Sequence, residues 1–408
     1  MPPLPHPEQR QRVLFYLPMV TNWWFVHIVE PLIRRVASGH EVHILAPAPW
    51  RGTGIGADEL ARCADLAEVR WYIMDGADHP STRTVPEDAE GLIGFVRDLA
   101  PDFVLCRTAD FDTVRHFPGI VRLLMEGRFE PFAPPPRWIL LADRPHDYGA
   151  LAPLAPAEEA RLDAMLAPAW HRLQQRLAPP PDERLALFAR LGIPADRPLV
   201  LLPLECEMDD NFFLAHRLSP RPNAALVRHV SAQLGDRFTL AVTNHPLNDA
   251  HVDAGPLIEA IGDCDNAVLL PPAIGPLAAT LAIARHADGM LVGDSKTFAL
   301  AAFFGVPIHR HSQFASGSWL NAYAELPPFL ADIAAGTARR PDPELARRWF
   351  AQYLLNDAVD PLDADDDLLA RLRCPVGPER WDRALTRLER TLPALFGAEG
   401  PTPPGRTE

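Results

Sequence analysis

Cysteine is scarce in this sequence, and the few cysteines lie far apart. None of the five forms a CxxC pair, which argues against a disulfide framework and against a cysteine zinc site. This usage fits a reducing cytosol, so we expect a cytoplasmic protein. The five cysteines are Cys63, Cys106, Cys206, Cys264 and Cys374.

Long apolar runs are also missing. No run of about 18 uncharged apolar residues occurs, so we expect no membrane-spanning helix. The N-terminal stretch MPPLPHPEQRQR lacks the apolar segment of a signal peptide. An amphipathic surface could still hold the protein at the inner face of a membrane, so peripheral membrane contact stays open.

Basic residues are outnumbered by acidic ones, and the formal net charge is −14. Nucleic acid is therefore excluded as the main partner, because a phosphate backbone demands clustered lysine and arginine. A small anionic ligand remains compatible with this balance, because a local basic pocket can form on an acidic protein. The sequence says nothing about the oligomeric state.

The chain has 408 residues, 48% of them hydrophobic, which predicts two domains with separate cores. We expect an N-terminal acceptor domain over residues 1–180 and a C-terminal donor domain over 181–340. Helices over 341–396 would return to the first domain. The last segment, 397–408, reads as a disordered tail.

Strand and helix patterns alternate in both halves. In the first half, an apolar strand at 13–17 precedes a helix that Asn22 could cap and that runs to about Ser38, and a second strand follows at 41–46. This is the opening of a doubly wound sheet. Further strands are expected at 69–74, 103–106 and 137–142, and in the second half at 198–204, 238–242, 267–270 and 290–292. Helices are expected at 223–234 and 277–285.

The predicted fold class is α/β, with two Rossmann-like doubly wound domains facing a cleft and with C-terminal helices. This is the outline of the GT-B glycosyltransferases, an inference from pattern alone. The glycine-rich RGTGIGA at 51–57 is a weak signal for dinucleotide binding, and a flexible loop is the better interpretation.

Three polar segments of the second half follow predicted strands, and ligands bind at the carboxyl ends of strands in such sheets. The first is an acidic segment containing Glu207, Asp209 and Asp210. The second is His245-Pro246, and the third is Asp294-Ser295-Lys296-Thr297. Because these strands belong to one sheet, we expect the three segments to converge on one crevice.

The third segment turns at Gly293-Asp294 after a short strand. We expect it to enter a helix whose first residues are Ser295, Lys296 and Thr297. Two hydroxyls and a lysine at a helix N-terminus form a plausible cradle for a phosphate or carboxylate. Simple helix capping is the alternative.

The other two segments also have two interpretations each. The proline after His245 favours an extended backbone, which would point the ring into the crevice to donate to a phosphate or leaving oxygen. A histidine satisfied at a strand end is the alternative. The acidic segment could contact a ribose or base edge, hold Mg²⁺, or form a solvated loop. We expect no required cofactor, with Mg²⁺ as an option.

In the first half, a general base is wanted at the strand ends. The candidates are carboxylates, and arginines beside them could hold an anionic acceptor. An aromatic pair after the first strand could stack on a sugar, although core packing and capping are alternatives for all of these residues. The candidate bases are Asp110, Asp112 and Asp143, with Asp147 nearby, and the acceptor candidates are Arg107, Arg144, Trp23 and Trp24.

Residues 198–310 resemble the bacterial Kdo transferases of capsular-polysaccharide biosynthesis. The resemblance lies in VLLPLECEMDD, SPRPNAALVRHV, FTLAVTNHP and GDSKTFALAAFFGVPI. Those enzymes have GT-B folds and use CMP-linked Kdo, and they are similar to CMP-sialic acid transferases with acidic, HP and serine motifs. Here Thr243 stands where the family pattern often has lysine, and Lys296 separates Ser295 from Thr297.

The resemblance implies that His245-Pro246 and the serine motif hold the phosphate of a cytidine nucleotide. The acidic motif would contact the nucleotide or act near the donor. The expected function is sugar transfer from a nucleotide-activated donor, such as CMP-Kdo, to a glycan or lipid-linked acceptor in bacterial surface polysaccharide synthesis. Alternatives are a UDP- or GDP-sugar transferase or epimerase, a CDP-glycerol-type phosphotransferase, and a non-catalytic binding protein with this fold.

Overall fold

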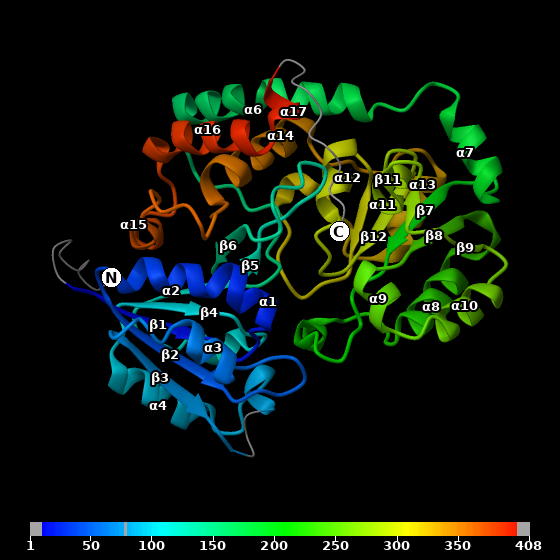
Figure 1. Ribbon diagram of the computed structural model, residues 1–408. Helices are drawn as coiled ribbons and strands as arrows, with labels where there is room; N and C mark the ends of the chain where they lie inside the picture. Colours follow the sequence, from blue (N-terminus) through cyan, green and yellow to red (C-terminus); the bar gives the residue numbers. More distant parts are fainter. Residues whose placement is uncertain (1–9, 77–79, 398–408) are drawn as a thin grey trace.

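The computed structural model describes residues 10–76 and 80–397 (Figure 1). The first nine residues of the N-terminal stretch lie outside this range, as does the predicted tail apart from Gly397. Within the described residues, no helix is both long enough and apolar enough to cross a membrane.

The first sheet has six strands within the described residues, in the order β3-β2-β1-β4-β5-β6. Neighbouring strands are parallel except β6, which runs antiparallel to β5. Its strands are β1 Arg12–Tyr16, β2 Glu41–Pro47, β3 Val69–Met74, β4 Phe103–Cys106, β5 Ile120–Glu126 and β6 Ile139–Ala142. Strand β5, which ends at Glu126, was not predicted from the sequence.

A continuous helical segment follows β1. It comprises α1 Asn22–Trp24, a π-helical turn Phe25–Val29 and α2 Glu30–Ala37. The cap is Thr21, whose Oγ1 accepts from the Trp24 N–H at 3.3 Å, so the prediction that Asn22 caps this helix is wrong. Asn22 instead donates its side-chain amide to Glu59 at 2.8 Å. The remaining helical segments of this half are α3 Ala57–Arg62, a 3₁₀ turn Ser81–Arg83, α4 Ala89–Leu99 and α5 Phe111–Val114.

The second sheet has five parallel strands within the described residues, in the order β13-β12-β7-β8-β9. They are β7 Leu199–Pro203, β8 Thr239–Thr243, β9 Ala267–Leu269, β12 Gly289–Val292 and β13 Ile308–Arg310. A small hairpin, β10 Ala273–Ile274 with β11 Leu277–Ala278, precedes α11 Ala279–Ala284. The helix predicted at 277–285 is therefore shorter, because its first two residues pair in this hairpin.

Further helices of the second half lie outside its sheet. They are α7 Glu183–Leu191, α8 Asn223–Leu234, α9 Pro246–His251, α10 Gly255–Gly262, α12 Phe298–Phe304 and α13 Leu326–Ala334, with 3₁₀ turns at Phe212–His216, Gly235–Arg237 and Ser318–Leu320. One apolar cluster joins α8 and α13 to one sheet face, and another joins α11 and α12 to the opposite face.

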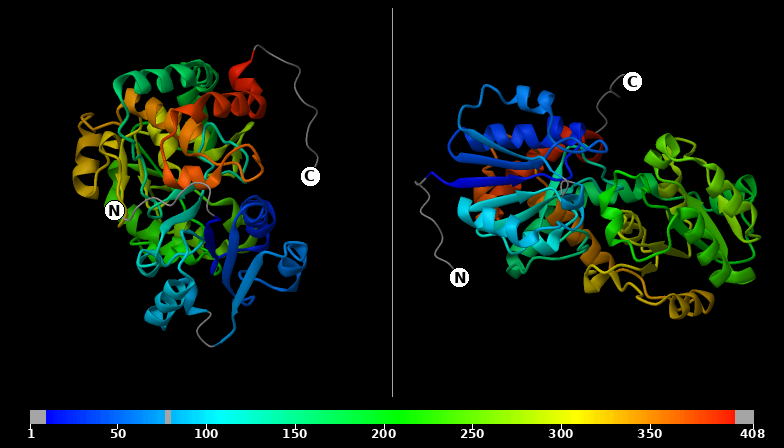
Figure 2. Two further views of the ribbon diagram at one scale, coloured as in Figure 1. Left: turned by 90° about the vertical axis from the view of Figure 1, so that its left-hand side faces the viewer. Right: turned by 90° about the horizontal axis from the view of Figure 1, so that it is seen from below.

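A layer of helices lies along the two halves (Figures 1 and 2). It contains α6 Pro156–Leu177, α14 Pro343–Gln352, a π-helical turn Tyr353–Asp357, α15 Leu368–Arg373, a 3₁₀ turn Pro378–Arg380, α16 Trp381–Thr391 and α17 Pro393–Phe396. Leu368, Leu369 and Leu372 of α15 pack into the core that α2 forms on the first sheet.

The chain also returns to the first sheet through its backbone. Ile139 and Val359 exchange two backbone hydrogen bonds at 3.0 and 2.9 Å. Arg137 donates twice to the Asp360 carboxylate, at 2.9 and 3.0 Å. The fold class predicted from the sequence is confirmed: two Rossmann-like doubly wound sheets with C-terminal helices, which is the GT-B architecture.

Candidate functional site

Lys296 is the only lysine among the 39 lysine and arginine residues of the chain. Its ammonium donates to the carboxylate of Glu126, the last residue of β5. This ion pair joins the turn after β12 in the second sheet to the carboxyl end of a strand in the first. Both side chains stay accessible, with 34% of Lys296 and 49% of Glu126 exposed, so a ligand can reach them.

Three basic side chains act on the carboxylate of Glu126. Lys296 has the largest effect, and together with Arg107 and His245 it lowers the pKa of Glu126 to about 2, although burial opposes this change. The carboxylate is therefore ionised throughout the physiological range. Since the side chain is half exposed, the pair contributes little to stability, and its importance lies in placing a carboxylate on this lysine.

The turn from Gly293 to Thr297 is held by its own hydroxyls. Ser295 Oγ and Thr297 Oγ1 lie 2.9 Å apart, and the Thr297 N–H donates to Ser295 Oγ at 3.3 Å. The prediction that a helix begins at Ser295 is wrong, because α12 begins at Phe298. The N–H groups of Phe298 and the next two residues bond to carbonyls only three residues earlier, so Ser295–Thr297 form a tighter turn.

Partly buried Glu205 supports this turn. Its Oε1 accepts from the Asp294 N–H at 2.6 Å, and a Cβ on Gly293 would lie only 2.5 Å from the same oxygen. A glycine is thus needed at 293 because the carboxylate approaches the backbone so closely. Burial raises the pKa of Glu205, and Arg217, 4.0 Å away, opposes this rise.

Asp294 is turned into the protein. Its Oδ1 accepts from Ser312 Oγ at 2.5 Å and lies 3.6 Å from Arg310, while burial raises its pKa. The Asp294 carbonyl accepts from the Tyr148 hydroxyl at 2.9 Å, and Arg310 donates to the His146 carbonyl at 2.6 Å. These contacts fasten the turn to the first half, which leaves Ser295, Lys296 and Thr297 as its accessible groups.

His245 stands beside this pair with one nitrogen available. Its Nδ1 accepts from the Leu247 N–H at 3.2 Å and so caps α9, in which Pro246 is the first residue. A neutral ring with an accepting Nδ1 carries its proton on Nε2. Desolvation, and to a lesser extent Lys296, lower the pKa of His245, while Glu126 opposes this. The Nε2–H is therefore a neutral donor, and it has no hydrogen-bond partner among the described residues.

The acidic segment is tied to the HP segment by Asn248, a residue that the sequence analysis missed. Asn248 Oδ1 accepts from the Glu207 N–H at 2.9 Å, and its Nδ2 donates to the Glu205 carbonyl at 2.9 Å. Glu207 Oε2 accepts from the Asn223 N–H at 2.6 Å, at the start of α8. The Glu207 carboxylate therefore holds α8, while Asp209 is exposed.

A pocket of about 550 Å³ lies next to this segment and takes one residue, Arg51, from the first half. Four carboxylates line it against one arginine, which disfavours phosphate there and suits hydroxyl or amino groups that donate hydrogen bonds. Its lining residues are Arg51, Glu207, Met208, Asp209, Asp210, His251, Val252 and Asp253. In the part of the chain that the structure describes, no group of three or more His, Cys, Asp or Glu residues is placed to hold a metal ion.

The three candidate bases of the first half have local partners. Asp110 caps α5 by accepting from the Thr113 N–H at 3.0 Å, and burial raises its pKa. Asp112 is exposed and pairs with Arg115 at 3.4 Å, and exposed Asp143 pairs with Arg122 at 2.8 Å. None of these contacts reaches the second half. Asp147, by contrast, accepts from the Ala315 N–H of the second half at 2.9 Å.

The candidate acceptor residues differ in exposure. Trp23 is 43% exposed, whereas Trp24 is buried with the Arg107 guanidinium 3.7 Å from its ring centroid. Burial lowers the pKa of Arg107 to about 10, and the side chain donates to the Leu124 carbonyl at 3.1 Å. Arg144 is exposed and lies over Phe111 and Phe314, at 5.4 and 5.7 Å.

Aromatic side chains also pack between the two halves. Phe212, from the second half, shares an apolar cluster with Met19 and Ala109 of the first. Phe213 lies 4.9 Å from the Arg107 guanidinium and 5.4 Å from the ring of His146. Desolvation lowers the pKa of His146 to about 3, so the His146 ring that contacts Phe213 is uncharged at neutral pH.

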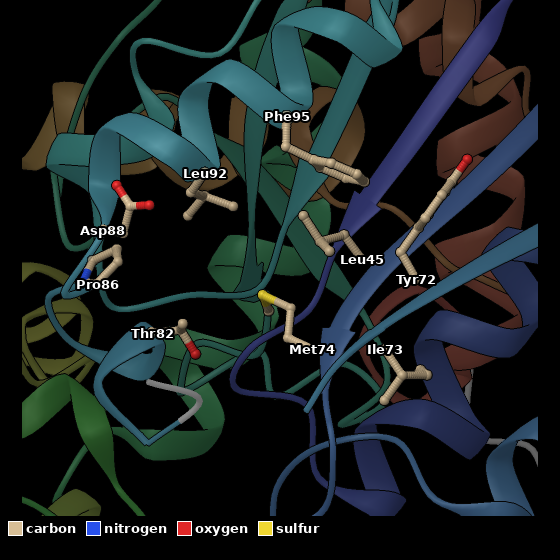
Figure 3. A pocket seen from close by; sticks show the side chains of 9 residues that line it. All are labelled: Leu45, Tyr72, Ile73, Met74, Thr82, Pro86, Asp88, Leu92 and Phe95. Atoms are coloured by element: carbon tan, nitrogen blue, oxygen red, sulfur yellow. The ribbon is translucent and has the colours of Figure 1, made fainter. Parts of the chain in front are cut away.

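A separate apolar cavity of about 430 Å³ lies in the first half, between β2, β3 and α4 (Figure 3). It is lined by Leu45, Tyr72, Ile73, Met74, Thr82, Pro86, Asp88, Leu92 and Phe95. None of these residues belongs to the strand-end segments described above, so the cavity is not part of the same site.

The chain matches no protein-family model and no characterised protein by sequence. Solved structures with a similar arrangement include the β-Kdo 2,7 transferase of KpsC from Thermosulfurimonas dismutans. It is 12% identical, the alignment covers 93% of this chain and 100% of that chain, and the TM-score is 0.46.

Two other solved structures are more distant. ADP-heptose lipopolysaccharide heptosyltransferase II of E. coli is 11% identical over 73% of this chain and 84% of that chain, with a TM-score of 0.22. The UDP-GlcNAc 2-epimerase of Methanocaldococcus jannaschii is 13% identical over 83% and 98%, with a TM-score of 0.30. These likenesses assign no activity to this chain.

Proposed function

We propose that the protein is a glycosyltransferase that uses a nucleotide-activated sugar. The observation that carries this proposal is the position of Lys296. The only lysine of the chain lies at a strand end of the second sheet, facing the first sheet, and already holds an oxyanion, the Glu126 carboxylate. A site that accepts a carboxylate oxygen here suits a phosphate oxygen equally well.

The groups around Lys296 fit a departing nucleotide phosphate. When the bond between the sugar and the phosphate breaks, negative charge develops on the phosphate oxygen. Lys296 would neutralise that charge, and the Nε2–H of His245 would donate a hydrogen bond to it. Ser295 and Thr297 offer hydroxyls on the same turn. Catalysis would then come from positioning and charge stabilisation, with no metal required and with Mg²⁺ as an option.

A CMP-sugar such as CMP-Kdo is the proposed donor, supported by the motif resemblance over residues 198–310. The nucleoside would extend toward the acidic pocket, where Asp209 and Asp210 can accept from ribose hydroxyls or a cytosine amino group. The proposed acceptor is a glycan or lipid-linked glycan of bacterial surface polysaccharide synthesis, on the first-half side. The reaction would take place in the cytoplasm, with optional contact at the inner face of the membrane.

A nucleotide screen tests the donor. Thermal unfolding would be followed with CMP, CDP, UDP and GDP, because a ligand at 100 times its Kd stabilises the fold by about 2.7 kcal/mol. We expect stabilisation by CMP above the others. Preference for UDP or GDP would favour the other transferases or an epimerase, and preference for CDP a CDP-glycerol-type reaction. Stabilisation by none of the four would favour a binding protein.

His245→Ala tests the phosphate contact. We expect the Kd for CMP, measured by calorimetry, to rise about 10-fold or more, because a hydrogen bond to a charged group is worth about 1.5–3 kcal/mol. His245→Asn keeps a capping side chain for α9 and controls for loss of local structure. Unchanged CMP affinity in the alanine variant would remove His245 from the site.

A further inference from the structure

Glu126 and Lys296 meet across the two halves without a structural need for the contact. Each side chain is substantially exposed, and such pairs contribute about 0–1 kcal/mol to stability. Three other hydrogen bonds already join the two halves. Arg310 donates to the His146 carbonyl, and the Tyr148 hydroxyl donates to the Asp294 carbonyl. Asp147 accepts from the Ala315 N–H. The Glu126–Lys296 pair is thus dispensable for holding the halves together.

The surroundings of Glu126 favour an anion. Lys296, Arg107 and His245 all act on this carboxylate, and they come from both halves. Glu126 therefore occupies the place where the proposed nucleotide phosphate would meet Lys296. A phosphate that binds there must move the carboxylate aside, which leaves it at the carboxyl end of β5, on the first-half side of the site.

We propose that Glu126 is the general base for the acceptor hydroxyl, and that it is held on Lys296 in the empty protein until the donor phosphate displaces it. This inference rests on the proposed function. Of the first-half carboxylates discussed above, Glu126 is the one with an ion pair to the accessible turn. Asp110, Asp112 and Asp143 are engaged within the first half.

The step balances without a further reactant. The Glu126 carboxylate takes the proton of the acceptor hydroxyl, and the acceptor oxygen forms a bond to the anomeric carbon. The bond between that carbon and the nucleotide phosphate oxygen breaks, and its electron pair stays on the phosphate. Lys296 and the His245 Nε2–H meet the new charge, and Glu126 later releases its proton to solvent.

Displacement by the donor also prepares the base. While Lys296 contacts Glu126, the low pKa of the carboxylate makes it a weak proton acceptor. A phosphate on Lys296 neutralises the ammonium, so the pKa of Glu126 rises toward its ordinary value of about 4.3 and proton transfer becomes more favourable. Binding of the donor thus switches on the base, and an acceptor that arrives first meets a carboxylate still engaged.

The single lysine makes the exchange directly measurable. Reductive methylation with ¹³C-formaldehyde labels Lys296 and the chain's α-amino group alone, and the ¹³C signal of the dimethylamine reports which group contacts the ammonium. In Glu126→Gln, we expect the ¹³C signal of Lys296 to shift and CMP to bind about 2- to 5-fold tighter, since a competing partner is gone. Glu130→Gln is the matched control, because Glu130 is 41% exposed and pairs with Arg128 at 3.3 Å.

Turnover provides the second readout. With saturating CMP-Kdo and a lipid-linked glycan acceptor, CMP release should fall about 10²- to 10⁴-fold in Glu126→Gln, while CMP affinity is kept or improved. Formate should restore part of the activity to Glu126→Ala, and Glu130→Gln should resemble the wild type.

The outcomes separate the two proposals. If CMP changes the Lys296 signal of the wild type but Glu126→Gln turns over normally, the donor site stands and the base assignment is wrong. If Glu126→Gln bound CMP no more tightly than the wild type, the proposal that the donor phosphate displaces Glu126 from Lys296 would be wrong. If CMP leaves the Lys296 signal unchanged in both proteins, or if the wild type does not consume CMP-Kdo, the proposed function itself fails.

Discussion

The carboxyl edges of the two sheets present their polar residues in different ways. In the second sheet, accessible groups follow β8 and β12 directly, and the backbone after β12 is held by Glu205, which accepts from the Asp294 N–H. In the first sheet, the carboxylates that follow β4 and β6 serve as a helix cap or pair with nearby arginines. A polar residue after a strand therefore indicates a site only when its neighbours leave part of the side chain available to a ligand, as they leave the Nε2–H of His245.

Replacing Lys296 should have the largest effect at the second-sheet edge. We expect Lys296→Met to weaken CMP binding about 10- to 100-fold, because a charge-assisted hydrogen bond worth about 1.5–3 kcal/mol is lost. Lys296→Arg should recover part of this affinity, since the charge remains but the donor geometry changes. Calorimetry with CMP measures both. Asp143→Asn, at the first-sheet edge, should bind as the wild type, and a similar loss there would break the contrast.

The close contact between Gly293 and the Glu205 carboxylate should have the next largest effect. Gly293→Ala should lower the free energy of unfolding by about 1–3 kcal/mol, because the new Cβ would meet the Glu205 carboxylate at 2.5 Å. Urea unfolding gives the value. Gly39→Ala is the control, since a Cβ there meets nothing within 4 Å. If Gly293→Ala left the free energy of unfolding unchanged, the Glu205 carboxylate and the turn would adjust freely. The edge of the second sheet would then not be rigid.

The smallest effects should come from the first-sheet carboxylates. Asp110→Ala should cost about 0.5–2 kcal/mol of stability through loss of the α5 cap, while Asp112→Ala, on the surface, should cost less than about 0.5 kcal/mol. Thermal unfolding compares the two. Neither change should alter CMP affinity. A drop in CMP affinity in either variant would move that residue to the donor side and weaken the contrast.

The sequence predicted the repeating strand–helix pattern well, because apolar strands and their turn residues are local signals. The strands Val69–Met74 and Phe103–Cys106 and the helix Asn223–Leu234 have the predicted bounds. The sequence indicated less well which side chains bond to the backbone at the start of each helix. The hydroxyls of Ser295 and Thr297 bond within the turn and delay the helix to Phe298, and Thr21 takes the cap expected of Asn22.

The ion pair of Glu126 could not be predicted because it depends on a missed strand and on contacts between distant segments. The segment IVRLLME at 120–126 follows Gly119, whose φ of 81° marks a turn, and Gly127 follows it. An apolar run bounded by two glycines could have indicated β5. Its pairing with Lys296, however, joins residues 170 positions apart in the chain, and no local pattern encodes such a contact.

The pairing of Val359 with Ile139 bears on how the protein is made. β6 is the last strand of the first sheet, and Val359 closes part of its outer edge. During synthesis, the whole second sheet emerges from the ribosome before residue 359 does. The first sheet therefore spends that interval with an uncovered edge strand, the kind of surface that recruits strands from other chains. A chain cut short before Val359 would keep that edge open permanently.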